Sequence, residues 1–263
     1  MNGILLNRSE FLTLLNATRA QAVVGFNSEE LFPEEAKLRA LVLEGIESLK
    51  QRGLLRVEND LHVIDTDLLA LMMVVSYPQL AAVTTRDNPG TGQQLFLHYQ
   101  ASNVAVEQTL PDAVTHRLAV LPEPSALVPR LQAILPMPAE PSDRQAAVIL
   151  PQAAFMEVKA LAEDGQVQAA MQSLVQHGMA EPAARLLADS LQNPSLGGTI
   201  ALLQCQDDEV TDAREMALVQ GPQAAWAITQ TEPGAPSYRV ATVTADAVGG
   251  QLQQWVKDLL GSH

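Results

Sequence analysis

The residues that could do chemistry in this sequence are few and far apart. Of its five histidines, His98 and His116 stand on two predicted strands of one sheet, where their side chains could approach each other. Together with nearby acids they would offer general acid–base catalysis. None of the histidines is spaced from another as a pair of metal ligands on one element, so we predict no metal site.

The single cysteine, Cys205, is followed by acidic residues at positions 207–209. Neighbouring carboxylates raise a thiol pKa, so this cysteine is expected to be a poor nucleophile. The acidic segment Gln206–Asp212 lacks the alternating ligand spacing of a calcium loop. The sequence also contains no serine-hydrolase, zinc-protease, C-x-x-C or Walker motif. We therefore predict no catalytic residues and no cofactor.

The segment NPGTGQ, from Asn88 to Gln93, contains two glycines, as phosphate-binding loops do. It joins two predicted strands, has no lysine and is not followed by a helix. We interpret it as a turn.

The formal net charge is −14, and both halves of the sequence are acidic. Such a surface repels phosphate backbones and anionic headgroups, so we expect neither a nucleic-acid nor a membrane partner. The longest apolar run, Leu68–Val75, is too short to span a bilayer, and the first residues do not read as a signal peptide. One cysteine allows no internal disulfide, which fits a reducing compartment. We expect a cytoplasmic protein.

The two predicted strands that the Asn88–Gln93 turn joins hold it in place. They belong to a half of the sequence in which helices are predicted to come first and strands to follow. In the first half we expect a helix over Pro33–Arg52, a short hairpin turning at 58–60 and a helix ending at Val75. The strands expected to follow are Leu80–Arg86, Gln94–Gln100, Asn103–Gln108 and Thr115–Val120, before a closing helix at Ser125–Leu135. Their short connections require antiparallel neighbours, so they form a meander.

The second half is predicted to repeat this order. The expected helices are Gln152–Glu163, Gln166–Gln176 and Pro182–Leu191, the expected strands are Thr199–Gln204, Glu215–Val219, Ala224–Thr229 and Tyr238–Val243, and the closing helix is Ala245–Leu260. Because helices and strands come in runs, the fold class is α+β, with an antiparallel four-stranded meander and a closing helix in each half.

Short matches between the halves suggest an internal duplication. GIESLKQRGLL, from Gly45 to Leu55, shares its spacing of Ser-Leu and Gly with AMQSLVQHGMA, from Ala170 to Ala180. Four further matches keep the same order: Ile4–Leu14 with Val148–Val158, Tyr77–Thr85 with Asn193–Ala201, Thr115–Leu121 with Ser237–Val243, and Leu127–Leu135 with Gly250–Leu260. We predict two diverged α+β repeats, 1–137 and 146–263, packed together and joined by a proline-rich linker at 138–145.

The segment 37–65 resembles a winged-helix element, with a helix, a glycine and a hairpin. A DNA-binding element of this kind presents basic residues to phosphates. Here the basic residues are offset by acids, and the hairpin tip Glu58–Asp60 is acidic. We therefore expect this element to be structural.

This order of elements, with SLKQRGLL, a wing, TDLLALMMVVSYPQLAAVTTR, a meander and a second diverged copy, resembles the EspG-like family of type VII secretion chaperones. The resemblance implies a quasi-two-fold α+β fold and a non-catalytic, cytosolic chaperone that binds the helical tip of a secreted substrate. It also makes the turn a candidate contact loop, formed by Asn88, Pro89, Gly90, Thr91, Gly92 and Gln93.

Three functions therefore remain open. A protein-binding module would present a broad apolar patch or groove to a helical partner. An enzyme built on His98, His116 and nearby acids would instead present a deep pocket with converging polar groups. A structural homodimer would pair unpaired strands between two chains.

Overall fold

The main element of the fold is one antiparallel sheet of ten strands, in the order β1-β7-β6-β5-β4-β9-β10-β11-β12-β8. The computed structural model describes residues 3–27, 31, 33–90, 92–112, 114–140, 142, 145–206, 209–232 and 234–261. The strands are β1 (Ile4–Asn7), β4 (Leu80–Asn88), β5 (Gly92–Ala101), β6 (Val104–Thr109), β7 (Thr115–Val120), β8 (Ala147–Pro151), β9 (Leu196–Gln206), β10 (Glu209–Gln220), β11 (Ala225–Gln230) and β12 (Ser237–Thr242).

The predicted α+β class is therefore correct, but the prediction of two four-stranded meanders is not confirmed. Each half adds an edge strand, β1 or β8, and the halves join into one sheet where β4 pairs with β9. The edge strands were missed because they are only 4 and 5 residues long, and each runs straight into a helix, at Asn7 and at Pro151. The β4–β9 pairing joins residues far apart in sequence, and local patterns carry no information on such contacts.

The helices agree with their predicted ranges to within two residues where a range was given. They are α1 (Arg8–Thr18), α3 (Glu35–Gln51), α4 (Thr66–Ser76), α5 (Leu127–Ile134), α6 (Gln152–Glu163), α7 (Val167–Gln176), α8 (Glu181–Gln192) and α9 (Ala245–Gly261), with a 3₁₀ turn at Pro124–Ala126. A separate hairpin pairs β2 (Leu55–Glu58) with β3 (Leu61–Ile64). None of the helices in the described part of the chain is both long and apolar enough to cross a bilayer.

Local sequence signals explain where these elements begin and end. Asn7 caps α1 by accepting a hydrogen bond from the Glu10 backbone at 2.9 Å, and the Glu10 carboxylate accepts one from the Asn7 backbone in return. Gly53, with φ of +70°, follows α3 in the left-handed conformation that glycine tolerates best. Asn59 and Asp60 also have positive φ and form the tight turn between β2 and β3.

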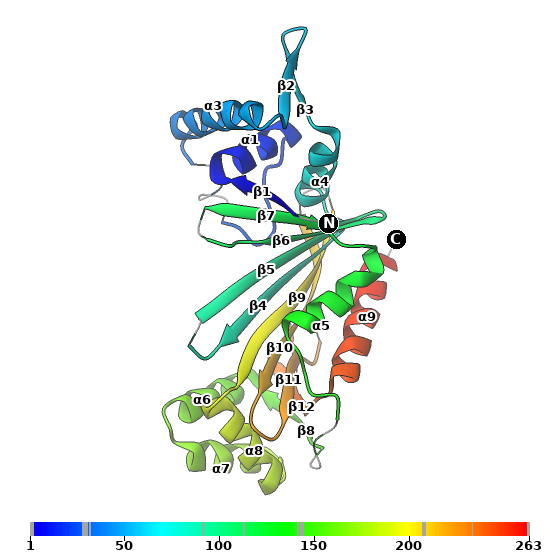
Figure 1. Ribbon diagram of the computed structural model, residues 1–263. Coiled ribbons are helices and arrows are strands. Elements are labelled where there is room, and N and C mark those ends of the chain that lie inside the picture. The colour runs from blue at the N-terminus through cyan, green and yellow to red at the C-terminus, as the bar shows by residue number, and fades with distance from the viewer. Residues whose placement is uncertain are drawn as a thin grey trace.

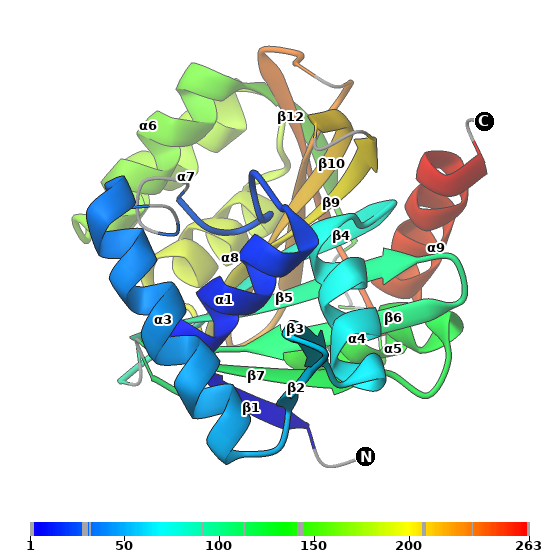
Figure 2. The same ribbon diagram turned by 90° about the horizontal axis from the view of Figure 1, so that it is seen from above.

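Helices cover both faces of the sheet, but in different places. On one face, α5 and α9 pack side by side over the middle strands (Figures 1 and 2). On the other face, α1, α3 and α4 lie at one end of the elongated molecule and α6, α7 and α8 at the opposite end (Figure 1). We call these the α5/α9 face and the open face.

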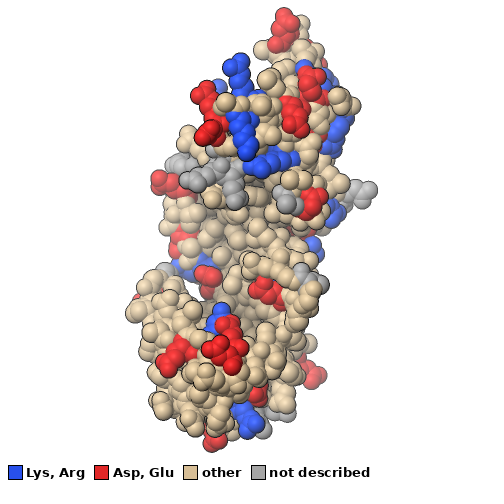
Figure 3. Space-filling view, turned by 90° about the vertical axis from the view of Figure 1, so that its left-hand side faces the viewer, with Lys and Arg blue, Asp and Glu red and all other residues tan. Residues whose placement is uncertain are grey.

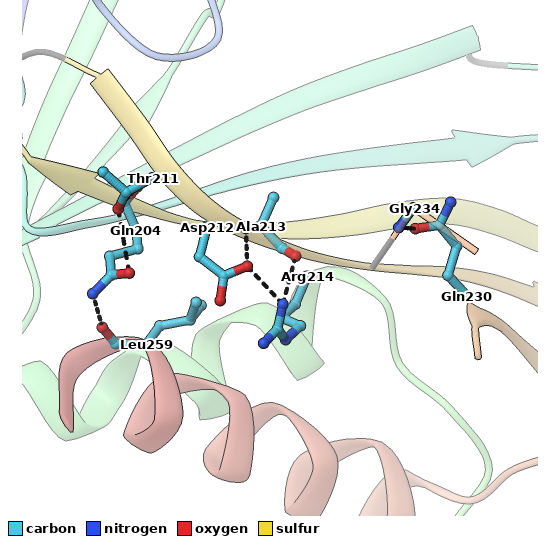
Figure 4. Close-up of polar contacts among 8 residues, drawn as sticks. All are labelled: Gln204, Thr211, Asp212, Ala213, Arg214, Gln230, Gly234 and Leu259. Atoms are coloured by element: carbon cyan, nitrogen blue, oxygen red, sulfur yellow. Dashed lines mark hydrogen bonds and ion pairs between the residues drawn. The ribbon is translucent and has the colours of Figure 1, made fainter. Parts of the chain in front are cut away.

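A polar contact fastens the end of α9 to the sheet. The Gln204 side chain in β9 donates a hydrogen bond to the Leu259 carbonyl at 2.6 Å (Figure 4). The Thr211 hydroxyl donates to the Gln204 amide oxygen at 3.2 Å, from an irregularity in the β9–β10 pairing. This link holds α9 over the middle strands and so keeps the α5/α9 face covered.

Candidate partner-binding groove

The predicted contact loop lies at the mouth of a groove on the open face. Asn88 and Gly92 pair at the end of the β4–β5 hairpin, and Gly90 has φ of +88°, so the interpretation as a turn is correct. Asn88, Pro89 and Gln93 line a cavity of about 830 Å³. Gly90 and Gly92 are exposed but do not line the cavity, and Thr91 lies outside the described residues.

The floor of this groove belongs to a regular grid of side chains on three neighbouring strands. The grid has three rows across β4, β9 and β10. The register of the β4–β9 and β9–β10 pairs shows which residues share a row. The rows are Asp87–Gly197–Val219, Thr85–Thr199–Ala217 and Val83–Ala201–Glu215. The first two rows line the cavity, and the third continues the same face of the sheet. We call these nine residues the central patch.

None of the helices in the described part of the chain crosses the middle of the central patch. At its ends, Val83 packs against the core under α1 and α4, and Ala217 and Val219 pack against the core under α6 and α8. All nine residues are half-buried or exposed. Residues that alternate with them on the α5/α9 face are buried, including Thr84, Ile200 and Leu218, each at 0% exposure. In the space-filling view of the open face, the band between the two helical ends carries few charged side chains (Figure 3). At these positions the sheet is therefore more accessible on the open face than on the α5/α9 face.

A glycine sets the depth of the groove. A Cβ built on Gly197 would meet only the Asp87 Cβ at 3.9 Å and the Leu218 carbonyl at 4.0 Å, so the position opens onto the groove. The neighbouring Gly198 differs, because its Cβ would lie 2.1 Å from the Thr85 carbonyl oxygen. On the floor the Thr85 and Thr199 hydroxyls lie 2.9 Å apart and hydrogen bond to each other.

Helices α6 and α8 form one wall of the groove. Phe155 and Leu191 contribute its buried apolar side chains. Lys159 and Glu163, one turn apart on α6, form an exposed ion pair at 3.6 Å above them. The arrangement is an apolar trough with a polar rim, which suits a partner surface better than a small polar substrate.

The two candidate histidines lie on opposite faces of the sheet, so they do not form one site. His98 lies on the α5/α9 face, where its Nε2 is 3.2 Å from the Glu107 carboxylate. Arg130 of α5 also hydrogen bonds to Glu107. Burial alone would raise the pKa of Glu107, but hydrogen bonds from His98 and Arg130, and their charges, lower it to about 2.

His116 belongs to the core of the open face instead. Its ring stacks on Phe11 of α1 with centroids 4.0 Å apart, and its Nδ1 lies 2.7 Å from the Gln108 amide nitrogen. Burial, and then the charge of Arg8, lower the pKa of His116 to about 4, and Asp112 opposes this shift. Each histidine is thus held by buried contacts on its own face of the sheet.

Cys205 is half-buried, and burial raises its pKa to about 11. The direction agrees with the prediction, and the cause is burial. Positions 207–208 of the acidic segment Gln206–Asp212 lie outside the described residues. Within the described ranges, no group of three or more histidine, cysteine or acidic side chains is arranged to hold a metal ion.

Comparison with known proteins decides the fold. No family model and no curated protein matches the chain by sequence. Among solved structures, the chain is similar to the Mycobacterium tuberculosis type VII secretion system chaperone EspG5, solved in complex with the PE25–PPE41 dimer. The TM-score is 0.66 over 97% of this chain and 96% of that chain, at 15% sequence identity. The chain has an EspG-like fold.

The EspG-like fold thus confirms the resemblance found in the sequence at the level of architecture. The sequence did not predict the central patch, apart from the adjoining turn. One signal for it was present: Gly197 and Gly198 follow each other directly before the predicted strand Thr199–Gln204, and they lie inside β9 in the structure. Glycine in a strand often marks close approach of another group.

Proposed function

We propose that this protein is a non-catalytic protein-binding module, a chaperone-like adaptor that covers a helical segment of its partner in the groove. The EspG-like fold supports the proposal, because the similar structure is a chaperone solved with a bound protein dimer. The position of Asn88, Pro89 and Gln93 at the groove supports the predicted contact loop.

The observation that carries the proposal is the uncovered central patch. Its outer strands, β4 and β10, are two strand spacings apart, about 10 Å. An α-helix with its side chains is about 10 Å across, so one helix fits over the three strands. The α5/α9 face shows how helices complete this sheet, since Ile200 and Leu218 are fully buried there. On the open face a partner helix would take the equivalent place.

Filling the groove tests this proposal. In Gly197→Leu the new side chain enters the groove, and the surrounding backbone has room for its Cβ. Gly250→Leu is the matched control, because Gly250 of α9 lies outside the groove and no atom lies within 4 Å of a Cβ built there. The two variants and the unmodified chain serve as bait in native lysate, with mass spectrometry as the readout.

We expect a stoichiometric protein that copurifies with the unmodified chain and with Gly250→Leu but is lost with Gly197→Leu. If Gly197→Leu captures the same partner protein as the unmodified chain, binding in the groove is contradicted. Turnover in a substrate screen would favour the enzyme alternative.

A structural homodimer is a second candidate, favoured by the sheet edges. Ile149 of edge strand β8 is 62% exposed, and Leu5 of edge strand β1 is 50% exposed. Apolar side chains at a sheet edge favour pairing with another chain. Light scattering coupled to size exclusion decides this point, and a monomer at micromolar concentration argues against it.

The finer architecture is also part of the proposal: two diverged repeats at 1–137 and 146–263, packed together and related by a quasi-two-fold. The symmetric strand order supports it, since β1, β7, β6, β5 and β4 are matched by β8, β12, β11, β10 and β9. Tyr77-Pro78 precedes β4 as Asn193-Pro194 precedes β9. A cytoplasmic location, consistent with the single cysteine, also remains a proposal.

A further inference from the structure

The charges on the central patch specify what kind of helix it accepts. Two of its nine residues are acidic, and they occupy opposite corners of the grid: Asp87 on β4 and Glu215 on β10. Both are exposed, and none of the ion pairs among the described residues involves either of them. Lys159, a cation on the groove wall, is paired with Glu163.

The separation of these two carboxylates follows from the strand register. Asp87 lies four residues along β4 from Val83, which shares a row with Glu215. Four residues span about 13 Å along a strand, and β10 lies two strand spacings, about 10 Å, to the side. The diagonal is therefore about 16 Å, and it passes over Thr199 at the centre of the grid.

This diagonal matches a simple helical repeat. An α-helix rises about 16 Å in eleven residues and completes about three turns over that length. Residues i and i+11 therefore point to the same side of a helix, with the apolar positions between them facing the small side chains of Thr199 and Ala217.

We infer that the groove selects a helix with a basic residue at each end of its apolar face, at positions i and i+11. One base pairs with Asp87 and the other with Glu215, across the apolar floor. This inference rests on the proposed function, and it adds the charge and spacing of the partner segment. Unpaired carboxylates at both ends repel an acidic helix of the same shape, so they also provide specificity.

Synthetic helical peptides of 21 residues test the inference directly. The first peptide carries two lysines at i and i+11 flanking a Leu/Ala face. The second has the same composition with the lysines at i and i+5, on different sides of the helix, and the third has glutamine in place of both. Affinity for the full chain is measured by fluorescence anisotropy at low ionic strength.

We expect the i/i+11 peptide to bind about five-fold more tightly than the i/i+5 peptide, as two exposed ion pairs would give. Asp87→Asn combined with Glu215→Gln removes this preference. Glu44→Gln combined with Glu157→Gln removes the same charge at exposed positions outside the groove and retains it.

Two results overturn the inference in distinguishable ways. If the peptides bind equally and Gly197→Leu blocks all of them, the charge pattern is wrong while groove binding stands. If no peptide binds, or if Gly197→Leu blocks none of them, the inference fails together with the proposed function.

Discussion

The packing of α3 on α1 depends on the absence of a side chain at Gly45. A Cβ built there would lie 2.2 Å from the Ser9 carbonyl oxygen and 2.2 Å from the Thr13 hydroxyl. The Thr13 hydroxyl also contacts the Val42 carbonyl at 3.1 Å, which links the two helices. We predict that Gly45→Ala separates α3 from α1.

The magnitude follows from three opposing contributions. An ordinary van der Waals contact is about 3.5 Å, so α3 must move by about 1.3 Å to accept the methyl group. Overpacking of this kind costs about 1–3 kcal/mol, and loss of the Thr13–Val42 hydrogen bond costs about 1 kcal/mol more. Alanine returns about 1 kcal/mol through its better helix propensity. The net loss of unfolding free energy is about 2 kcal/mol.

Urea denaturation of Gly45→Ala measures this loss as a lower midpoint with an unchanged slope. Gly250→Ala is the control, because Gly250 also lies in a helix but has open space around its Cβ. That control should stabilise the protein by about 1 kcal/mol. Equal or greater stability of Gly45→Ala would show that the helices do not approach as described.

Three further substitutions probe the sheet. Folding lowers the pKa of His116 from 6.5 to about 4, so between pH 6.5 and 4 the unfolded chain binds more protons than the folded one. The free energy of unfolding therefore decreases as the pH is lowered through this range. His116→Phe should flatten the thermal-unfolding midpoint between pH 6.5 and 4, removing about 2 kcal/mol of pH dependence. Arg130→Gln should raise the lowered pKa of Glu107, so that on acidification the stability that ionised Glu107 contributes is lost at a higher pH than in the unmodified chain. An acid-unfolding midpoint at the same pH in both proteins would contradict this. Gln204→Leu should cost about 1–2 kcal/mol and speed hydrogen exchange at the end of α9, near Leu259; unchanged exchange there would refute the anchoring role.

Much of the fold could be predicted because its elements carry local signals. Gly53 ends α3, Asp65 caps α4 by accepting from the Leu68 backbone, and alternating side chains mark the strands. Strand β10 exceeded its predicted range because its first residues, from Glu209 to Arg214, are mostly polar and read as a loop. Such residues form a strand here because they extend the pairing with β9.

The candidate site was predictable only in part. The Asn88–Gln93 turn stood out in the sequence, whereas the patch beside it arises from pairing between β4 and β9, more than 100 residues apart. Nothing local indicates that Asp87 and Glu215 share one surface. The predicted approach of His98 to His116 is wrong because side chains alternate between the two faces along a strand, and the two histidines, on β5 and β7, fall on different faces.

The most direct test of the central claim is a photocrosslink from the rim of the groove. A photoreactive phenylalanine analogue at Asp87, which is exposed, tolerates the substitution without disturbing the core. The same analogue at exposed Glu44 on α3 is the control. Binding in the groove predicts a covalent adduct between one partner protein and the probe at 87, with none at 44. An adduct that forms at 44 and not at 87 would place the binding surface elsewhere.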